Sequence, residues 1–429
     1  MASFAIRNFG CRVNQAEAFD WAEELQRRGL RFEPDPERAD IVVVNSCTLT
    51  VRADRDVRKF VRGLLRGHPG ARLVVTGCLA ERDPGAFAGL PGVGTIVPNA
   101  AKDSLPDLIA PLAGERAAEP GAGIAPEGRP FRARALLKVQ DGCDGACRFC
   151  VIPSVRGRSA SVPLDAAVDR ARARAARGFG EIVLTGIHLS SWGRDLEPRQ
   201  SLTDLLAALD ALPGDFRVRL SSLDPRLMPA PFLDFLGSSR RVCPHFHLSL
   251  QHASAGILRA MGRAAAPGEY EELLAALRAR APEAAIGADI LVGFPGETDK
   301  DFRELEAFLA EAPLAYFHVF AYSPRPGTAG EAEGGVPSRI KAGRARRLRG
   351  LSRAKWAAYR AAFVDRELDG IVVREGRPEA VVLTPNYIDV RVPGDAAARG
   401  RAVRVRILRA TEDSAYGEIV AGRGAGFRV

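Results

Sequence analysis

The chain has 429 residues, 26% of them charged and 46% hydrophobic, with a formal net charge of +9. This length allows two or three domains with sizeable cores. No apolar run approaches a membrane span, and the first residues lack the pattern of a secretory signal. Seven cysteines, an odd number, argue against a disulfide framework. We therefore expect a soluble protein of the reduced cytoplasm, with no membrane partner.

Strands and helices alternate at the start of the chain, which predicts a parallel sheet with right-handed crossovers. Apolar strand patterns end at Cys11, Cys47 and Cys78, and helix patterns follow at 14–28 and 51–66. The carboxyl ends of parallel strands share the edge where open α/β sheets bind ligands. We expect the three thiols to converge there on a metal centre. The alternative is that all three are buried residues of apolar strands.

A domain boundary is predicted next. Residues 112–130 are rich in Ala, Gly, Glu and Pro and have no sustained apolar period, which indicates a linker after a first domain at 1–111.

The most informative motif is the run VQDGCDGACRFC at 139–150. It holds Cys143, Cys147 and Cys150, spaced so that three thiols can surround one small centre and no obvious protein ligand fills the fourth position. A four-iron cluster on three thiolates leaves one iron open to bind a cofactor. A Cys3His zinc site is the main alternative, but the nearest downstream histidine, His188, is too distant for a compact zinc motif. Three buried, unreactive cysteines are the other alternative.

Residues 131–365 again alternate between strand and helix patterns. Strands are predicted at 135–139, 181–185, 217–221, 246–250, 286–292 and 317–322, with helices such as 164–177 and 269–280 between them. Six such units predict a partial (β/α)6 barrel, whose chemistry lies at the carboxyl ends of the strands. The cysteine triplet, Gly186 and the turn from Gly293 to Glu297 all occupy such ends.

The remaining residues, 366–429, favour a small β-barrel. Short strands are predicted at 371–373, 380–383, 387–392, 403–408 and 417–420, separated by turn residues. Residues 339–370 just before it hold ten basic and three acidic side chains, a concentration that suits a phosphate backbone. A solvated helix face is the alternative. The candidate RNA-binding residues are Arg344, Arg347, Tyr387, Arg404 and Arg406.

Together these segments resemble the radical S-adenosylmethionine (SAM) methylthiotransferases, whose terminal β-barrel is called a TRAM domain. The matching runs are NFGCRVN (8–14), VNSCT (44–48), VTGC (75–78), QDGC (140–143), CVIP (150–153), GADILVGFPGET (287–298) and FAYS (320–323). The resemblance extends along nearly the whole chain. It implies an α/β enzyme with an auxiliary-cluster domain, a radical SAM barrel and an RNA-binding barrel.

The resemblance also implies the cofactors, two [4Fe–4S] clusters and SAM. Cys143, Cys147 and Cys150 would hold the cluster that binds and cleaves SAM, and Gly186 and Glu297 would help to bind this cofactor. Cys11, Cys47 and Cys78 would hold the auxiliary cluster, which presents the sulfur. The expected partners are the anticodon arm of a tRNA, an electron donor and a sulfur source.

Branches of the family differ in substrate. The runs LTGIHL (184–189), CPHFHL (243–248), SSLDP (221–225) and NYI (386–388) resemble the branch that modifies carbon 2 of N6-threonylcarbamoyladenosine 37 in tRNA. Isopentenyladenosine 37 and a ribosomal-protein aspartate remain alternatives within the family. A non-catalytic iron–sulfur or zinc RNA-binding protein is the alternative from another class.

The chain departs from the family pattern at two places. It reads Gln251-His252-Ala253 where relatives read Gln-Ser-Gly, and Gly262 stands where relatives have Asn, with alanines at 264–266. Both departures bear on substrate contacts rather than on the clusters.

Overall fold

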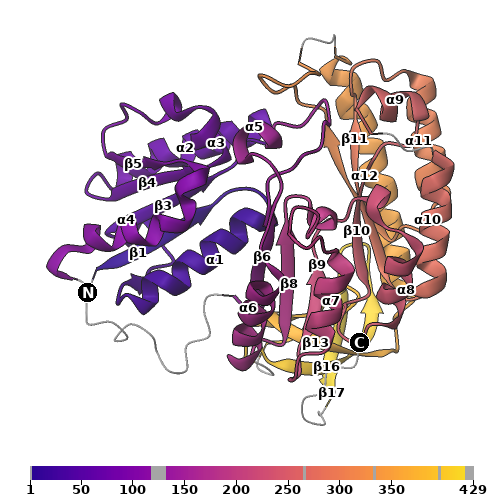
Figure 1. Cartoon of the computed structure of the whole chain (residues 1–429). Helices are drawn as coiled ribbons and strands as arrows, with labels where there is room; N and C mark the ends of the chain where they lie inside the picture. The colour runs from indigo at the N-terminus through magenta and orange to yellow at the C-terminus, as the bar shows by residue number, and fades with distance from the viewer. Residues whose placement is uncertain (1, 117–131, 264–266, 332–334, 395–397, 421–429) are drawn as a thin grey trace. The chain divides into compact units, whose positions relative to one another are not determined.

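The computed structural model describes residues 2–116, 132–263, 267–331, 335–394 and 398–420 (Figure 1). The chain divides into two compact units. One unit comprises Met1–Pro130, Asp141–Ser159 and Ser323–Glu331, and the other comprises Phe131–Gln140, Ala160–Tyr322 and Ala332–Val429. Most of the predicted linker, and the alanines at 264–266, lie outside the described residues.

A five-stranded sheet in the order β2-β1-β3-β4-β5 forms the centre of the first unit. Its strands are β1 (Ser3–Asn8), β2 (Arg31–Phe32), β3 (Ile41–Ser46), β4 (Arg72–Gly77) and β5 (Val93–Val97). The strand pairings within the described part of this sheet are all parallel, with Asn8 opposite Asn45 and Asn45 opposite Thr76. Neighbouring strands therefore end at the same level. Every residue of β3 is buried, as expected for a central parallel strand covered on both faces.

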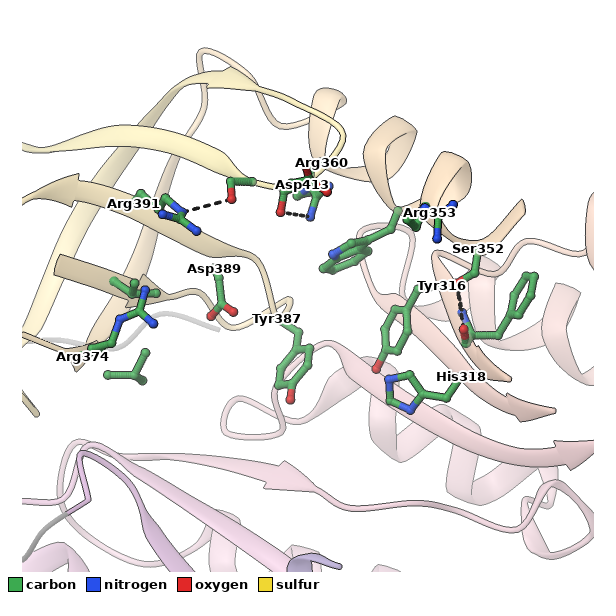
Figure 2. Close-up of a pocket in the computed structure, with 15 residues that line it drawn as sticks. Tyr316, His318, Ser352, Arg353, Arg360, Arg374, Tyr387, Asp389, Arg391 and Asp413 are labelled. Carbon is green, nitrogen blue, oxygen red and sulfur yellow. Dashed lines mark hydrogen bonds between the residues drawn. The ribbon is translucent and has the colours of Figure 1, made fainter. Parts of the chain in front are cut away.

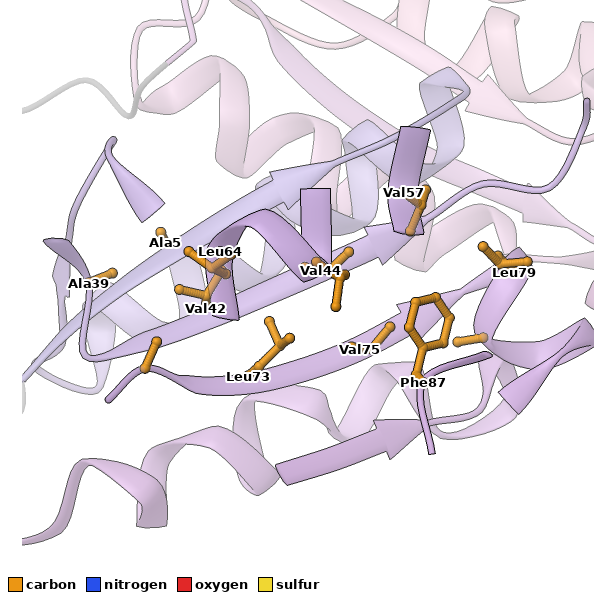
Figure 3. Close-up of a cluster of buried hydrophobic side chains, with 13 residues drawn as sticks. Ala5, Ala39, Val42, Val44, Val57, Leu64, Leu73, Val75, Leu79 and Phe87 are labelled. Carbon is orange, nitrogen blue, oxygen red and sulfur yellow. The ribbon is translucent and has the colours of Figure 1, made fainter. Parts of the chain in front are cut away.

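Apolar side chains cover one face of this sheet (Figure 3). Val42 and Val44 of β3 and Leu73 of β4 pack in one cluster with Val57 and with other residues of helix α2 (Val51–Gly67). Burial of each such side chain is worth about 1.5–3 kcal/mol. Helix α1 (Arg12–Arg27) begins directly after Cys11, and α3 (Cys78–Arg82) begins at Cys78 itself.

The second unit contains the predicted partial barrel. Its strands are β6 (Ala135–Asp141), β7 (Ala160–Ser161), β8 (Glu181–Gly186), β9 (Arg217–Leu220), β10 (His245–Gln251), β11 (Ala285–Val292) and β12 (Tyr316–Ala321). They form one sheet in the order β7-β6-β8-β9 and another in the order β10-β11-β12. Parallel bridges from Val218 to Val242 and from Leu223 to Leu248 join the two sheets.

Helices connect these strands. They include α6 (Leu164–Ala176), α7 (Leu202–Asp210), α8 (Ala230–Ser238), α10 (Pro267–Arg280) and α11 (Asp299–Glu311). Thr298 and Asp301 form a capping box that starts α11, and apolar residues at helical spacing, such as Phe302 and Leu305, are buried. These connections place all the strand ends that carry motifs at one end of the barrel.

The terminal segment of the second unit is a closed barrel in the order β13-β14-β15-β17-β16. Its strands are β13 (Glu367–Arg374), β14 (Glu379–Leu383), β15 (Asp389–Pro393), β16 (Ala402–Ala410) and β17 (Ala415–Val420). The long helix α12 (Ser338–Ala361) precedes it. Trp356 of α12 and the buried Phe363 just after it pack against the barrel core.

A buried ionic cluster lies between the terminal barrel and the strands before it. The Glu181 carboxylate, fully buried at the start of β8, pairs with Arg217 at 2.6 Å and Arg219 at 2.8 Å. These guanidinium groups also donate to the main-chain oxygens of Leu383, Thr384 and Pro385. Burial raises the pKa of Glu181, but its arginine partners outweigh burial and hold it well below its usual value. The cluster thus fixes the loop between β14 and β15.

The structure confirms the predicted fold class. It is an α/β protein with a parallel N-terminal sheet, a partial barrel and a closed terminal barrel. Two details differ. β15 begins at Asp389 rather than at Tyr387, because Tyr387 has a φ of 70° and cannot continue an extended strand. β2 and β5, at the two edges of the first sheet, were not predicted. Among the described residues, no helix has the length and apolarity needed to span a membrane.

The ionic cluster generates a stability prediction. We expect Glu181→Gln to lower the free energy of unfolding by about 3–5 kcal/mol, because two buried guanidinium groups lose their counter-charge. The matched control is Glu379→Gln, which removes a partly exposed pair with Arg391 and should cost less than about 1 kcal/mol. Urea unfolding monitored by circular dichroism measures both effects.

The stability difference between wild type and Glu181→Gln should also depend on pH. Because the folded-state pKa of Glu181 is depressed, its stabilisation is complete above the unfolded carboxyl pKa of about 4.3 and is lost as the pH falls towards the folded value. The difference between wild type and Glu181→Gln should therefore narrow below about pH 4. A difference that stays constant at acid pH would contradict this assignment.

Candidate metal centres

The structure brings the ends of three neighbouring strands, and with them three cysteines, to one sheet edge. Cys11 follows β1, Cys47 follows β3 and Cys78 follows β4, and these strands are adjacent and parallel. Gly10, with a φ of 101°, makes room for one of them: a Cβ there would lie 2.7 Å from the Cys47 Sγ. A side chain at this position would fill the space where the sulfur lies.

These three thiols suit a metal. Burial raises the pKa of Cys11, and it raises the pKa of Cys47 to about 12, so both stay protonated at neutral pH unless a metal displaces the proton. Cys47 and Cys78 are buried and all three are free thiols. Soft thiolate donors select iron–sulfur clusters or zinc over hard cations. Three donors leave one coordination position for another ligand.

Arg156 connects this edge with the second cysteine motif. It ends the short helix α5 (Ile152–Arg156), which follows the triplet 143–150, and its side chain is only 1% exposed. Its Nε donates to Cys78 Sγ at 3.4 Å, and its Nη2 donates to Asn14 Oδ1 at 2.6 Å. Asn14 in turn accepts from Cys11 Sγ at 3.5 Å. One guanidinium group therefore holds side chains beside two of the three thiols.

Carboxylates hold Arg156 in place. Glu17 Oε1 accepts from Arg156 Nη1 at 2.8 Å, and Asp141 pairs with the same nitrogen at 2.9 Å. Lys102, 3% exposed, donates to the other Glu17 oxygen at 2.7 Å. Sequence reasoning missed this network, because an Arg at the end of a short helix and a Glu in a longer helix carry no local pattern that predicts burial.

The second triplet lies in a compact loop of the same unit. Cys143, Cys147 and Cys150 are reduced thiols and partly exposed. The amide of Gly145 donates to Cys143 Sγ at 3.3 Å, and the amide of Cys143 donates to the Gly157 oxygen at 3.1 Å. Partial exposure suits a centre that must admit a small molecule.

Gly142 explains the tightness of this loop. It has a φ of 65°, and a Cβ there would lie 1.8 Å from the main-chain oxygen of Arg158. Only glycine allows this close approach of the two backbone segments.

The two predicted cofactor-binding residues of the second unit lie at strand ends, as expected. Glu297 is fully buried; it accepts from the Gly293 amide at 2.5 Å and pairs with Arg344 at 2.6 Å, so it holds its own turn. Gly186 lies against Gln140, whose side-chain oxygen would be 2.9 Å from a Cβ at that position. That Gln140 oxygen accepts from the His188 amide at 2.7 Å.

The predicted RNA-binding residues are dispersed. Arg344 is buried and committed to Glu297 and Asp299, which removes it from the surface. Arg347 is exposed on α12 beside Glu306. On the terminal barrel, Arg404 and Arg406 share Glu367 as a surface partner.

Histidines and an aspartate line up across β10, β11 and β12. His247 Nε2 lies 2.9 Å and His318 Nδ1 3.5 Å from Asp289 Oδ1. His245 and His247 both reach the hydroxyl of Tyr316. Burial raises the pKa of Asp289, but its hydrogen bonds with the two histidines outweigh burial and hold it well below the usual range. The distances are those of hydrogen-bonded pairs, so the cluster needs no ion.

Two family models match the segments that contain the cysteine motifs. Residues 137–309 match the radical SAM superfamily, and residues 3–97 match an uncharacterized protein family, UPF0004. A threonylcarbamoyladenosine tRNA methylthiotransferase of Aquifex aeolicus is 36% identical over 94% of this chain and 99% of its own. Its Thermotoga maritima counterpart is 34% identical over 86% of each chain. A tRNA-2-methylthio-N(6)-dimethylallyladenosine synthase of Erythrobacter litoralis is 31% identical over 97% of each.

Solved structures agree on the fold. The radical SAM methyltransferase TsrM of Kitasatospora setae, with tryptophan and a SAM analogue bound, aligns with a TM-score of 0.55 over 81% of this chain and 83% of its own. Its sequence identity to this chain is 17%, so the likeness concerns the fold alone.

Arg156 gives a testable consequence. We expect Arg156→Met to lower the free energy of unfolding by about 3–5 kcal/mol, because Glu17 and Asp141 lose a buried partner. Iron bound at Cys11, Cys47 and Cys78 should also fall, because the side chains beside these thiols are no longer held. Iron analysis in a Cys143/Cys147/Cys150→Ala background measures that centre alone.

Two further variants help to interpret the effect of Arg156→Met on stability and iron content. Arg156→Lys keeps the charge but cannot reach all these partners, so it should give intermediate values. Arg158→Gln, at a side chain that is 94% exposed, is the control and should change neither quantity. Normal iron content and stability in Arg156→Met would show that the network does not support the centre.

Proposed function

The chain belongs to the radical SAM methylthiotransferases that act on tRNA, and from this premise we propose that it adds a methylthio group to carbon 2 of N6-threonylcarbamoyladenosine 37. The observation that supports the chemistry best is that one compact unit holds two sets of three reduced cysteines. Methylthiolation requires both radical formation and a sulfur source, which matches two centres with an open position each.

The cofactors are SAM and two [4Fe–4S] clusters. We assign one cluster to Cys143, Cys147 and Cys150 and the auxiliary cluster to Cys11, Cys47 and Cys78. Reductive cleavage of SAM supplies the radical that an adenine carbon–hydrogen bond requires, since that bond has no acidic proton at neutral pH. The protein's own residues would position these centres. Gly10 leaves room for the Cys47 sulfur, Gly142 lets the loop of the second triplet approach the backbone of Arg158, and Arg156 orients Asn14 and contacts Cys78.

In this proposal, Gly186 and Glu297 lie at the carboxyl ends of the barrel strands, where SAM would bind. Glu297 shapes the turn that begins at Gly293, and Gly186 leaves room for Gln140. Both are therefore positioning residues for SAM rather than groups that react.

The choice of adenosine rests on two observations. The motifs at 184–189 and 243–248 resemble the threonylcarbamoyladenosine branch, and the Aquifex aeolicus and Thermotoga maritima relatives carry that substrate in their names.

We further propose that the anticodon arm binds the second unit through Arg347, Arg404, Arg406 and Tyr387. The three arginines are exposed enough for phosphate contacts, and their exposed pairs with glutamates are weak enough to exchange for phosphate. Removing the whole terminal barrel would be a poor test, because Arg217 and Arg219 would lose buried acceptors. Point substitutions avoid that loss.

The remaining assignments complete this proposal. The domains are an auxiliary-cluster domain at 1–111, a linker at 112–130, a radical SAM domain at 131–365 and an RNA-binding barrel at 366–429. An electron donor and a sulfur source are needed as partners, and the cytoplasm is where such a tRNA substrate would be met.

Iron content tests the two centres. The anaerobically reconstituted protein should hold about eight irons per chain, and the Cys143/Cys147/Cys150→Ala variant about four, as two four-iron clusters require. Cys243→Ala, at a buried cysteine outside both sets, is the control and should keep the wild-type iron content. About four irons in wild type would contradict the two-centre assignment, and zinc instead of iron would favour the non-catalytic alternative.

Analysis of the modified nucleosides tests which adenosine is the substrate. Purified enzyme, SAM, a sulfide source and a reductant should convert N6-threonylcarbamoyladenosine in tRNA to its 2-methylthio form, and Cys78→Ala should abolish the product. Mass spectrometry of digested tRNA detects it. Product from isopentenyladenosine tRNA alone would move the chain to the other tRNA branch, and product in neither tRNA would favour the ribosomal-protein or non-catalytic alternative.

A further inference from the structure

A cavity of about 550 Å³ lies within the second unit, where helix α12, the start of β12 and the terminal barrel meet (Figure 2). Tyr316, the first residue of β12, lines it. The turn at Gly293–Glu297 follows the other, carboxyl end of the neighbouring strand β11. The cavity is therefore at the opposite end of the strands from the positions assigned to the reaction, and the proposed chemistry does not use it.

The size and the walls of the cavity suit one planar ligand. Its volume is within the range of about 300–1,000 Å³ typical of small-ligand sites. Tyr316, Trp356 and Tyr387 supply aromatic surface, and the rings of Tyr316 and Tyr387 are nearly parallel, 19° apart, with centroids separated by 6.5 Å. Figure 2 shows both tyrosines projecting toward the same space. Nucleic-acid bases stack on such rings whatever their sequence.

Charge in the cavity is mixed in a way that fits a nucleotide. Arg360 and Arg391 are committed to main-chain oxygens and to Glu379, respectively. Arg353 and Arg374 are exposed, and Arg353 makes an exposed ion pair with Glu412 at 3.5 Å. They lie on opposite sides of the cavity in Figure 2, and each can meet a phosphate. Asp389, near Tyr387 in Figure 2, would repel a simple anion but can accept from the amino group of a base.

Tyr387 is held in place at a cost in backbone conformation. Its φ of 70° lies in the left-handed region, which bulky residues rarely occupy. The Tyr387 amide donates to the Thr384 oxygen, and Arg219 donates to the oxygens of Thr384 and Pro385. The ring stacks on His245 with centroids 4.0 Å apart. Strain of this kind, about 1–3 kcal/mol, persists where the surroundings enforce it and is concentrated at ligand sites.

We propose that this cavity holds one unpaired nucleotide of the tRNA other than the target adenosine, with its base against the tyrosines and its phosphate at Arg374. The proposal rests on the proposed function, because it takes tRNA as the partner. It adds a second point of attachment, which would fix the register of the anticodon loop while the target adenosine is modified at the other end of the strands.

The test is equilibrium binding of the full-length protein to a fluorescently labelled anticodon stem–loop RNA, without SAM. A series of RNAs carries a single abasic site at each loop position in turn. One abasic site, other than that at position 37, should weaken binding to wild type by about 5- to 100-fold, the value of one stacked base. The same site should have little further effect on Tyr387→Asn, which removes the ring but tolerates a positive φ.

Matched variants separate the contribution of the cavity to RNA binding from the general affinity of the protein for RNA. Tyr416→Ala, at a tyrosine of β17, and Arg401→Gln, at an exposed arginine, lie outside the cavity and should keep the wild-type response to that abasic site. Arg374→Gln should weaken binding of every RNA and reduce its salt dependence. Circular dichroism confirms that each variant is folded.

The outcomes distinguish the two proposals. Suppose that wild type binds the RNA and that every abasic site weakens binding to Tyr387→Asn as much as it weakens binding to wild type. The cavity proposal then fails and the proposed function stands. The same holds if only the site at position 37 loses its effect, since the cavity would then take the target base. If wild type does not bind the RNA at all, the tRNA partnership fails and the cavity proposal fails with it.

Discussion

Parallel pairing of β1, β3 and β4 is the constraint on which the candidate chemistry depends. In-register parallel strands end at one edge, so residues far apart in sequence, Cys11, Cys47 and Cys78, come together without any local motif. Glycine at position 10 and buried surroundings then give the sulfurs a space that other side chains do not enter. A change that shifted one strand by a residue would move its cysteine to the other face of the sheet.

Arg156 holds the side chains around the thiols at this sheet edge in place. A guanidinium group offers five donors in a fixed plane, and here they reach a sulfur, an amide oxygen and two carboxylates. Because the side chain is buried, each contact is strong and the loss of any partner would be expensive. The residue also belongs to the segment that follows the second cysteine triplet, so the placement of that loop and the surroundings of Cys78 are linked.

In the second unit, the cluster around Glu181 has a comparable role. Arg217 and Arg219 share one carboxylate and still have donors left for the loop between β14 and β15. That loop then holds Tyr387 in a conformation it would not adopt alone. A buried ionic cluster is a weak source of net stability, but it specifies one arrangement of the terminal barrel against the strands. Specificity of position is what an RNA-binding surface requires.

The sequence alone determined most of the strands and helices in their order, the α/β class, both cysteine sets and the resemblance to the methylthiotransferases, because periodic burial and thiol spacing are local signals. Tertiary structure decided the rest. The burial of Arg344, the network of Arg156 and Glu17, and the cavity beside Tyr316 and Tyr387 each depend on residues from distant segments. No window of sequence predicts these, because an arginine at the surface and one in a buried ion pair have the same local pattern.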